Sequence, residues 1–245
     1  MNNRGGTNIN LPTWTPVNKV LIICLGGLFI LRSVLVKTVG VSFDRFLGLS
    51  GATFFNGFIY QIATYPFVCR GLMEILFGCL IIWFIGSDLE AGWGRKRYLT
   101  FLTVSTLGAA FVYLLVMSIF FGSSSPVWTY PLTGVGGITN ALCVAYAILY
   151  PNRTFLFMLL FPVKTKYFCV LLIIIQLYTG FMESSNMAGV LAWGHLAAMG
   201  FGFLYMVSVS SPTIKRIFSK PKRKKSKANL KIVGSDDDKP PKYWQ

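Results

Sequence analysis

Charged residues are scarce in this sequence: only 13% of its 245 residues are Asp, Glu, Lys or Arg, whereas 54% are hydrophobic. A soluble domain of this size usually carries about twice that fraction of charge. Apolar runs long enough to cross a bilayer recur as far as residue 210. This composition excludes an ordinary soluble domain and predicts a polytopic membrane protein.

Acidic residues are the rarest charged group, with eight against 23 Lys and Arg, so the formal net charge is +15. Residues 212–245 alone hold 11 of those 23 basic residues. A basic segment beside the last span is typical of a cytoplasmic tail that meets anionic lipid headgroups. No nucleic-acid partner is expected, because the tail has no signature of a nucleic-acid-binding fold.

The chain has a single histidine, His195, and none of its five cysteines forms a Cys-x-x-Cys pair. This spacing disfavours both a zinc site and a disulfide framework. We therefore expect no metal and no cofactor, and we interpret the cysteines as small apolar side chains packed in the membrane.

The hydrophobic runs divide into six predicted spans. Residues 98–152 contain no charge, and this run of 55 is too long for one span; a Gly-Ser-Pro break and Pro131 divide it. The predicted spans are about 20–36, 71–87, 98–121, 136–150, 167–182 and 188–210. The fold class is therefore all-α and polytopic: a membrane domain over 18–211, an N-terminal cytoplasmic arm over 1–17 and a basic, mostly flexible tail over 212–245.

Two connections are unusual. Residues 37–70 are too polar to span and too aromatic for a free linker, which favours a re-entrant or interfacial segment at headgroup depth. Residues 151–166 carry basic residues around an apolar patch and predict a loop with an interfacial segment. Near the outer end of the first span, Arg32 is expected to snorkel towards the headgroups.

Six spans put both termini on one side of the membrane. The short connections on that side carry Arg95, Lys96 and Arg97, then Arg153, Lys164 and Lys166, whereas the short loops on the other side carry no Lys or Arg. This asymmetry predicts cytoplasmic N- and C-termini. The lack of a signal peptide and of eukaryotic sorting signals favours a bacterial inner membrane.

Four motifs occur in a fixed order, at residues 60–67, 86–94, 134–137 and 194–202. They are similar to four patterns of the rhomboid family of intramembrane serine proteases: Trp-Arg-x-x-Thr-x-x-Phe, Gly-x-x-Leu-Glu-x-x-Trp-Gly, Gly-x-Ser-Gly and Ala-His-x-x-Gly-x-x-x-Gly. The sequence therefore resembles this family over about residues 18–210, and the resemblance implies a rhomboid-like bundle of six helices.

The resemblance also implies where a catalytic site would lie. The family uses a serine on the fourth span and a histidine on the sixth, with a histidine and an asparagine on the second span beside the oxyanion. The corresponding residues here are Gly136, His195, Glu74 and Gly78. Covalent catalysis needs an oxygen or sulfur nucleophile held against a base, and glycine has none. An ionised Glu74 would also oppose the developing oxyanion.

The leading interpretation is a catalytically inactive member that binds transmembrane segments or serves as a subunit of a larger membrane-protein complex. One alternative is a protease with an unorthodox nucleophile, for which Thr133 and Thr139 are the nearest hydroxyls in sequence. A transporter is a second alternative, which the lack of an inverted repeat disfavours.

Local patterns suggest further contacts. Glu74 has two open interpretations, a pair with Arg70 four residues earlier or a hydrogen bond from His195. A stripe of small residues on the sixth span predicts close packing against the fourth: Gly194, Ala198 and Gly202.

The tail carries the remaining predicted contacts. Its basic run is expected to bind anionic lipid headgroups through Lys222, Arg223, Lys224 and Lys225. An acidic triplet and a Pro-Pro pair precede Tyr243 and Trp244, which form a candidate docking peptide for an integral membrane protein partner.

Overall fold

The computed structural model describes residues 13–40, 43–122, 124–157, 161–183 and 186–209. Four predicted lipid contacts and two predicted docking residues lie outside the described residues: Lys222, Arg223, Lys224, Lys225, Tyr243 and Trp244.

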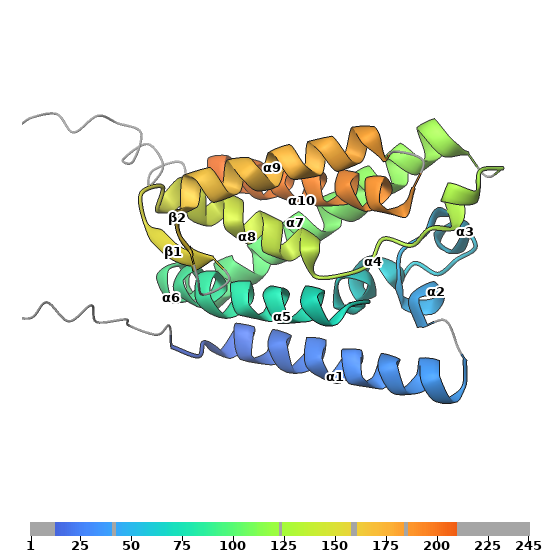
Figure 1. Ribbon diagram of the computed structural model, residues 1–245, viewed down its shortest axis with the longest axis horizontal. Helices are drawn as coiled ribbons and strands as arrows, with labels where there is room; N and C mark the ends of the chain where they lie inside the picture. The colour runs from blue at the N-terminus through green and yellow to red at the C-terminus, as the bar shows by residue number, and fades with distance from the viewer. Residues whose placement is uncertain (1–12, 41–42, 123, 158–160, 184–185, 210–245) are drawn as a thin grey trace, which may run out of the picture.

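Long apolar helices lie side by side and make up the body of the protein (Figure 1). They are α1 (Pro16–Thr38), α5 (Leu72–Ile81) continuing through the π-helical turn η2 (Ile82–Gly86) into α6 (Ser87–Trp93), α7 (Arg95–Val116) with η3 (Met117–Phe121), α8 (Gly136–Leu149), α9 (Thr165–Met182) and α10 (Met187–Val209). This arrangement confirms the prediction of a polytopic helical bundle.

Within the described residues, five helices are long and apolar enough to cross a membrane. The predicted fourth span is α8, which has only 14 residues, a length of about 21 Å. Its residues 137–146 are all buried, so neighbouring helices surround α8 and lipid does not. A helix in such a place need not match the bilayer thickness.

The second span extends to Trp93, six residues beyond its predicted end. Its acidic residue Glu90 is only 2% exposed, because its carboxylate accepts hydrogen bonds from the backbone amides of Val17 (3.1 Å) and Asn18 (3.2 Å). These amides lie in the first turn of α1, where helix N–H groups lack partners. Glu90 therefore satisfies that helix end and fastens α1 to α6.

Arg32 does not snorkel as expected. Its guanidinium donates to both carboxylate oxygens of Asp44, Nε to Oδ1 at 2.7 Å and Nη2 to Oδ2 at 3.1 Å. Arg70 Nε lies 3.1 Å from Asp44 Oδ2. A planar guanidinium matches a carboxylate in this two-pronged way, which favours pairing over solvation at the interface. The cluster joins α1 to the long loop and to the start of α5.

The long first loop folds into short helices: α2 (Phe43–Leu47), α3 (Gly51–Phe54), α4 (Gln61–Thr64) and the 3-10 turn η1 (Tyr65–Phe67). Its interior residue Gln61 is fully buried. Gln61 Nε2 donates to the carbonyl of Phe46 (3.1 Å), and its Oε1 accepts from Thr53 Oγ1 (2.6 Å). This loop is therefore internally hydrogen-bonded rather than a free linker.

The connection between α8 and α9 contains a small antiparallel hairpin, β1 (Thr154–Phe157) and β2 (Phe161–Lys164), in which Thr154 pairs with Lys164. An all-α prediction missed these strands. The segment is too short to span and is rich in residues that favour extended backbone. Arg153 anchors its start, because Nη1 lies 2.9 Å from Asp88 Oδ2 on α6.

The predicted packing of the sixth span on the fourth is confirmed. A Cβ atom on Gly202 would lie 3.2 Å from the Ala141 methyl carbon, and one on Gly137 would lie 3.5 Å from that of Ala198. Small residues thus bring α10 and α8 together at backbone distance.

Candidate functional site

The site is centred on the turn that leads into α8. After the 3-10 turn η4 (Pro126–Thr129), the chain runs extended to Leu132, whose amide and carbonyl pair with those of Leu49 at 2.6 and 2.9 Å. The amide of Gly134 then donates to the carbonyl of Tyr65 at 3.0 Å. The long first loop therefore holds this turn in place through backbone hydrogen bonds.

The turn requires glycine at position 134. Gly134 has φ +95°, a conformation that residues with a side chain rarely adopt. There is also no space for a side chain, because a Cβ atom on Gly134 would overlap Oε1 of Glu74. One helical turn further along α5, a Cβ atom on Gly78 would overlap Cγ1 of Val135. The α5 face bearing Glu74 and Gly78 therefore packs directly on the turn.

His195 approaches the same turn from α10. A Cβ atom on Gly136 would lie 2.5 Å from Nε2 of His195 and 2.7 Å from Cε1. Real Cβ atoms almost never approach other heavy atoms within 3.0 Å. The edge of the imidazole therefore occupies the space that a side chain at position 136 would need.

The structure thus gathers all four residues singled out by the resemblance at one turn: Glu74, Gly78, Gly136 and His195. Among the described side chains, those of Glu74 and His195 form no hydrogen bond with each other. Glu74 Oε2 instead accepts from the backbone amide of Arg70 at 3.0 Å, at the start of α5. The guanidinium of Arg70 turns to Asp44, so Arg70 and Glu74 interact through backbone rather than as a side-chain ion pair.

The candidate hydroxyl on α8 already makes a hydrogen bond within its own helix. Thr139 Oγ1 donates a hydrogen bond to the carbonyl of Gly136 at 3.0 Å, back along its own helix. The other candidate, Thr133, is 4% exposed, and its methyl group faces Gly48, on the side of the long first loop.

Sequence reasoning missed that the thiol of Cys69 lies at this turn. Cys69 is fully buried just before α5 and accepts a hydrogen bond from the backbone amide of Val135. Burial raises the pKa of its thiol to about 12, and the amide hydrogen bond offsets only part of that rise. The thiol is therefore protonated at neutral pH, which is the unreactive form. No motif spacing pointed to Cys69, because the contact joins residues 66 positions apart.

Fold and site together define a polytopic helical membrane protein in which a glycine turn faces a lone histidine. The sequence matches the family model described as Rhomboid domain over residues 56–212, which is more than half of the chain. The chain belongs to the rhomboid family, as its motifs predicted. A comparison with curated proteins found no match.

Proposed function

We propose that this protein is a non-catalytic member of the rhomboid family that binds transmembrane segments or serves as a subunit of a larger membrane-protein complex. The observation that carries the proposal is the contact between Gly136 and His195. The imidazole faces a residue with no side chain, at a distance that leaves no room for one. A base without a nucleophile in reach cannot start covalent catalysis.

The contact of Glu74 with Gly134 supports the same proposal. Oxyanion stabilisation requires hydrogen-bond donors aimed at the developing charge. A carboxylate offers only acceptors when ionised, and Glu74 takes up space beside the turn. Glu74 and Gly78 correspond to the two residues that lie beside the oxyanion on the family's second span. Neither of them then supplies a side-chain donor, because Gly78 has no side chain.

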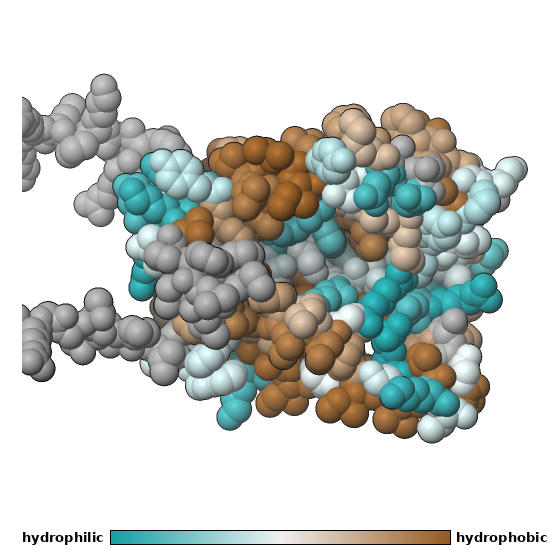
Figure 2. All heavy atoms as spheres, in the orientation of Figure 1, coloured by the Kyte–Doolittle hydropathy of each residue, from teal (hydrophilic) through white to brown (hydrophobic). Residues whose placement is uncertain are grey.

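The outward faces of α5 and α9 support a transmembrane partner. On α9, Leu171 and Ile174 are 50% and 57% exposed, and on α5 Met73 is 65% exposed. Hydrophobic residues lie over both of these helices in Figure 2. Inside a bilayer such faces meet either lipid or another helix. We place the proposed binding face between α5 and α9.

The proposed orientation is with both termini in the cytoplasm of a bacterial cell, at the inner membrane. Among the described residues, seven cations and two carboxylates lie at the end of the bundle where α1 begins and the hairpin lies (Figure 1). Four cations and three carboxylates lie towards the opposite end. The excess of Lys and Arg at one end favours the cytoplasmic side.

Co-purification in mild detergent followed by mass spectrometry tests the binding proposal. We would compare the full chain, a chain lacking residues 236–245, the α9 variants Leu171→Trp and Ile174→Trp, and the control Ile30→Trp on the exposed face of α1. The proposal expects a membrane-protein partner that is lost with the α9 variants, with the truncation or with both, and kept by the control. A partner profile identical in all variants would contradict it.

A further inference from the structure

The connection that carries the hairpin between α8 and α9 is apolar along its length and basic at both ends. Residues 154–163 read Thr-Phe-Leu-Phe-Met-Leu-Leu-Phe-Pro-Val and contain a single polar residue. Arg153 precedes this run, and Lys164 and Lys166 follow it. We call these three basic residues the hairpin base. Residues 91–182 contain no Asp or Glu, so no neighbour in sequence neutralises the hairpin base.

Backbone hydrogen bonds bring the three basic residues together. Thr154 pairs with Lys164 across the two strands. The amide and the hydroxyl of Thr165 both donate to the carbonyl of Arg153, at 3.0 and 2.8 Å. Lys164 and Lys166 are the two neighbours of Thr165, so each residue of the hairpin base lies at this contact or next to it.

Most of the positive charge of the hairpin base is left unpaired. Asp88 Oδ2 accepts from Arg153 Nη1 at 2.9 Å and from the hydroxyl of Tyr146 at 3.0 Å. Lys164 is exposed and Lys166 partly exposed, and neither forms an ion pair with a carboxylate of the described residues. The side chain of Arg153 is itself 54% exposed. Three cations against one carboxylate leave a net positive surface that attracts anions.

The hairpin base lies at the end of a membrane span. α9 is long and apolar enough to cross a membrane, and it begins at Thr165. Figure 2 shows hydrophilic residues at this end of α9, next to the hydrophobic surface along the helix. Two partly exposed rings accompany the cations: the Arg153 guanidinium lies 5.5 Å from the ring centre of Tyr150, and Lys166 Nζ lies 5.0 Å from that of Tyr167. Aromatic rings and cations at the end of a span are typical of headgroup depth.

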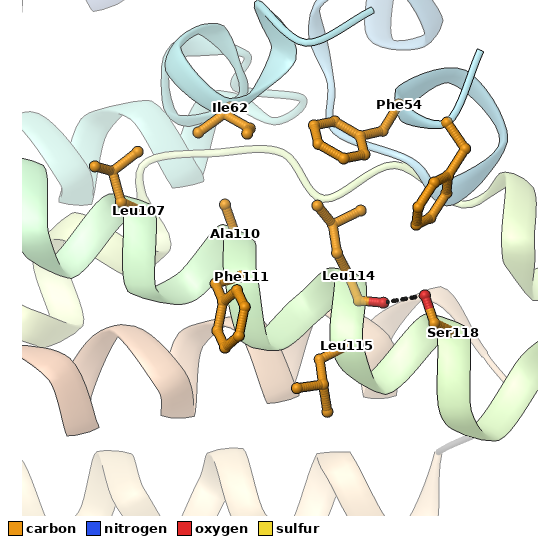
Figure 3. Close-up of a pocket in the computed structure, with 9 residues that line it drawn as sticks. Phe54, Ile62, Leu107, Ala110, Phe111, Leu114, Leu115 and Ser118 are labelled. Atoms are coloured by element: carbon orange, nitrogen blue, oxygen red, sulfur yellow. Dashed lines mark hydrogen bonds between the residues drawn. The ribbon is translucent and has the colours of Figure 1, made fainter. Parts of the chain in front are cut away.

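Two other surfaces of the described residues lack free cations. The hollow between the long first loop and α7 has one polar side chain in its lining, Ser118, whose Oγ already donates to the carbonyl of Leu114 at 2.8 Å (Figure 3). In the cluster where α5 begins, Arg32 and Arg70 share the carboxylate of Asp44. Neither surface offers the unpaired donors that a phosphate group requires.

We propose that the hairpin base binds the headgroup of an anionic phospholipid. Its phosphate oxygens accept hydrogen bonds from the exposed ammonium and guanidinium groups. The acyl chains continue along the apolar surface of α9, where Val170 is 54% exposed. The bound lipid thereby holds the start of α9 at headgroup depth. This site is separate from the turn at Gly136, and the inference does not depend on whether that turn is inert.

Photocrosslinking of the full chain in phosphatidylcholine vesicles tests this site. A trace of photoactivatable phosphatidylglycerol should label residues 150–167 at least about tenfold more than the matching phosphatidylcholine probe. Peptide mass spectrometry reports this label separately from any label on the tail. Lys164→Gln and Lys166→Gln should each lower it about fivefold, and the double variant should lower it further. The control Lys37→Gln with Arg45→Gln removes two exposed cations from the opposite end of the bundle and should leave it unchanged.

Several results would overturn the proposal. One is equal labelling of residues 150–167 by both lipids, and another is unchanged labelling in the lysine variants. Labelling confined to the tail would show that the hairpin base binds no lipid. Loss of the label on adding inorganic phosphate at constant ionic strength would assign the hairpin base to a soluble anion. If the double variant does not fold, the single variants decide the outcome, since each removes one side chain that forms no ion pair within the described residues.

Discussion

The Nε2 atom of His195 lies 2.5 Å from the position that a Cβ atom on Gly136 would occupy. The missing side chain and the nearby imidazole are thus two aspects of one packing arrangement, in which α10 contacts the first residue of α8. A residue larger than glycine at position 136 can fit only if His195 moves.

Replacing Gly136 should therefore lower the free energy of unfolding, and the size of this loss should depend on whether His195 is present. We expect Gly136→Ala to lower the free energy of unfolding by about 1–3 kcal/mol, as overpacked sites do. In a His195→Ala background the added methyl group meets no ring, so the same substitution should cost less by at least about 1 kcal/mol. Unfolding of the four proteins in detergent measures this coupling.

The neighbouring glycine provides the control. A Cβ atom on Gly137 would meet only the Ala198 methyl carbon, at an ordinary 3.5 Å. Gly137→Ala should therefore be neutral, or stabilise by about 0.5–1 kcal/mol through helix propensity. Equal costs at positions 136 and 137 would contradict the proposed contact.

Glu74 and Gly134 give a second steric prediction. Gly134→Ala combines a positive φ with overlap of the Glu74 carboxylate, and we expect it to destabilise by more than about 3 kcal/mol. Gly57→Ala is the matched control, since Gly57 has φ +101° but nothing within 4 Å of its Cβ position. That control should cost only the backbone strain, about 1–2 kcal/mol. Similar melting temperatures for both variants would show that Glu74 does not fill this space.

Asp44 should be the most sensitive residue of the loop cluster, because two arginines share its carboxylate. The three side chains are only 18–25% exposed. We expect Asp44→Asn to cost about 1–3 kcal/mol by leaving charged donors partly unpaired. Arg45→Gln, at the adjacent exposed position, should change stability by less than about 0.5 kcal/mol. Thermal unfolding measures the stability of both variants. An equal loss of stability in both would show that the ion pairs of Asp44 do not stabilise this loop.

The Cys69 thiol should react slowly and with a characteristic pH dependence. Because burial raises its pKa to about 12, the thiolate fraction should still rise about tenfold per unit between pH 7 and pH 10. An exposed cysteine introduced by Arg45→Cys should level off above its ordinary pKa of about 8.5. Site-resolved mass spectrometry of alkylation with iodoacetamide measures both profiles. A plateau for Cys69 near pH 8.5 would mean that the thiol is accessible and reactive.

Hydrophobic runs and glycine positions were sufficient to predict most of the fold. The predicted third span, 98–121, differs from α7 and η3 only by three residues at its start. The apolar run and Gly122 mark the end of this span correctly, whereas at its start the helix also takes in the charged residues Arg95, Lys96 and Arg97. The predicted fourth span, 136–150, ends only one residue beyond α8, so the short length of this helix was predicted as well. Neighbouring helices shield α8 from lipid, and it therefore need not match the bilayer thickness.

Polar contacts across the fold could not be predicted from sequence. Arg32 and Asp44 are 12 residues apart, and the loop between them must turn back before they can meet. Cys69 and Val135 belong to different elements that only tertiary packing brings together. In contrast, the four residues carried over from the family motifs do gather at one turn, because motif order in a shared fold encodes spatial proximity.

Incubation of the purified protein with a transmembrane substrate and a fluorophosphonate probe tests most directly whether the site is inert. The account predicts no cleavage and no labelling above the level of the His195→Ala variant. Turnover or labelling that depends on His195 and disappears in Thr139→Ala or Cys69→Ala would contradict it, because a nucleophile would then be within reach of the imidazole.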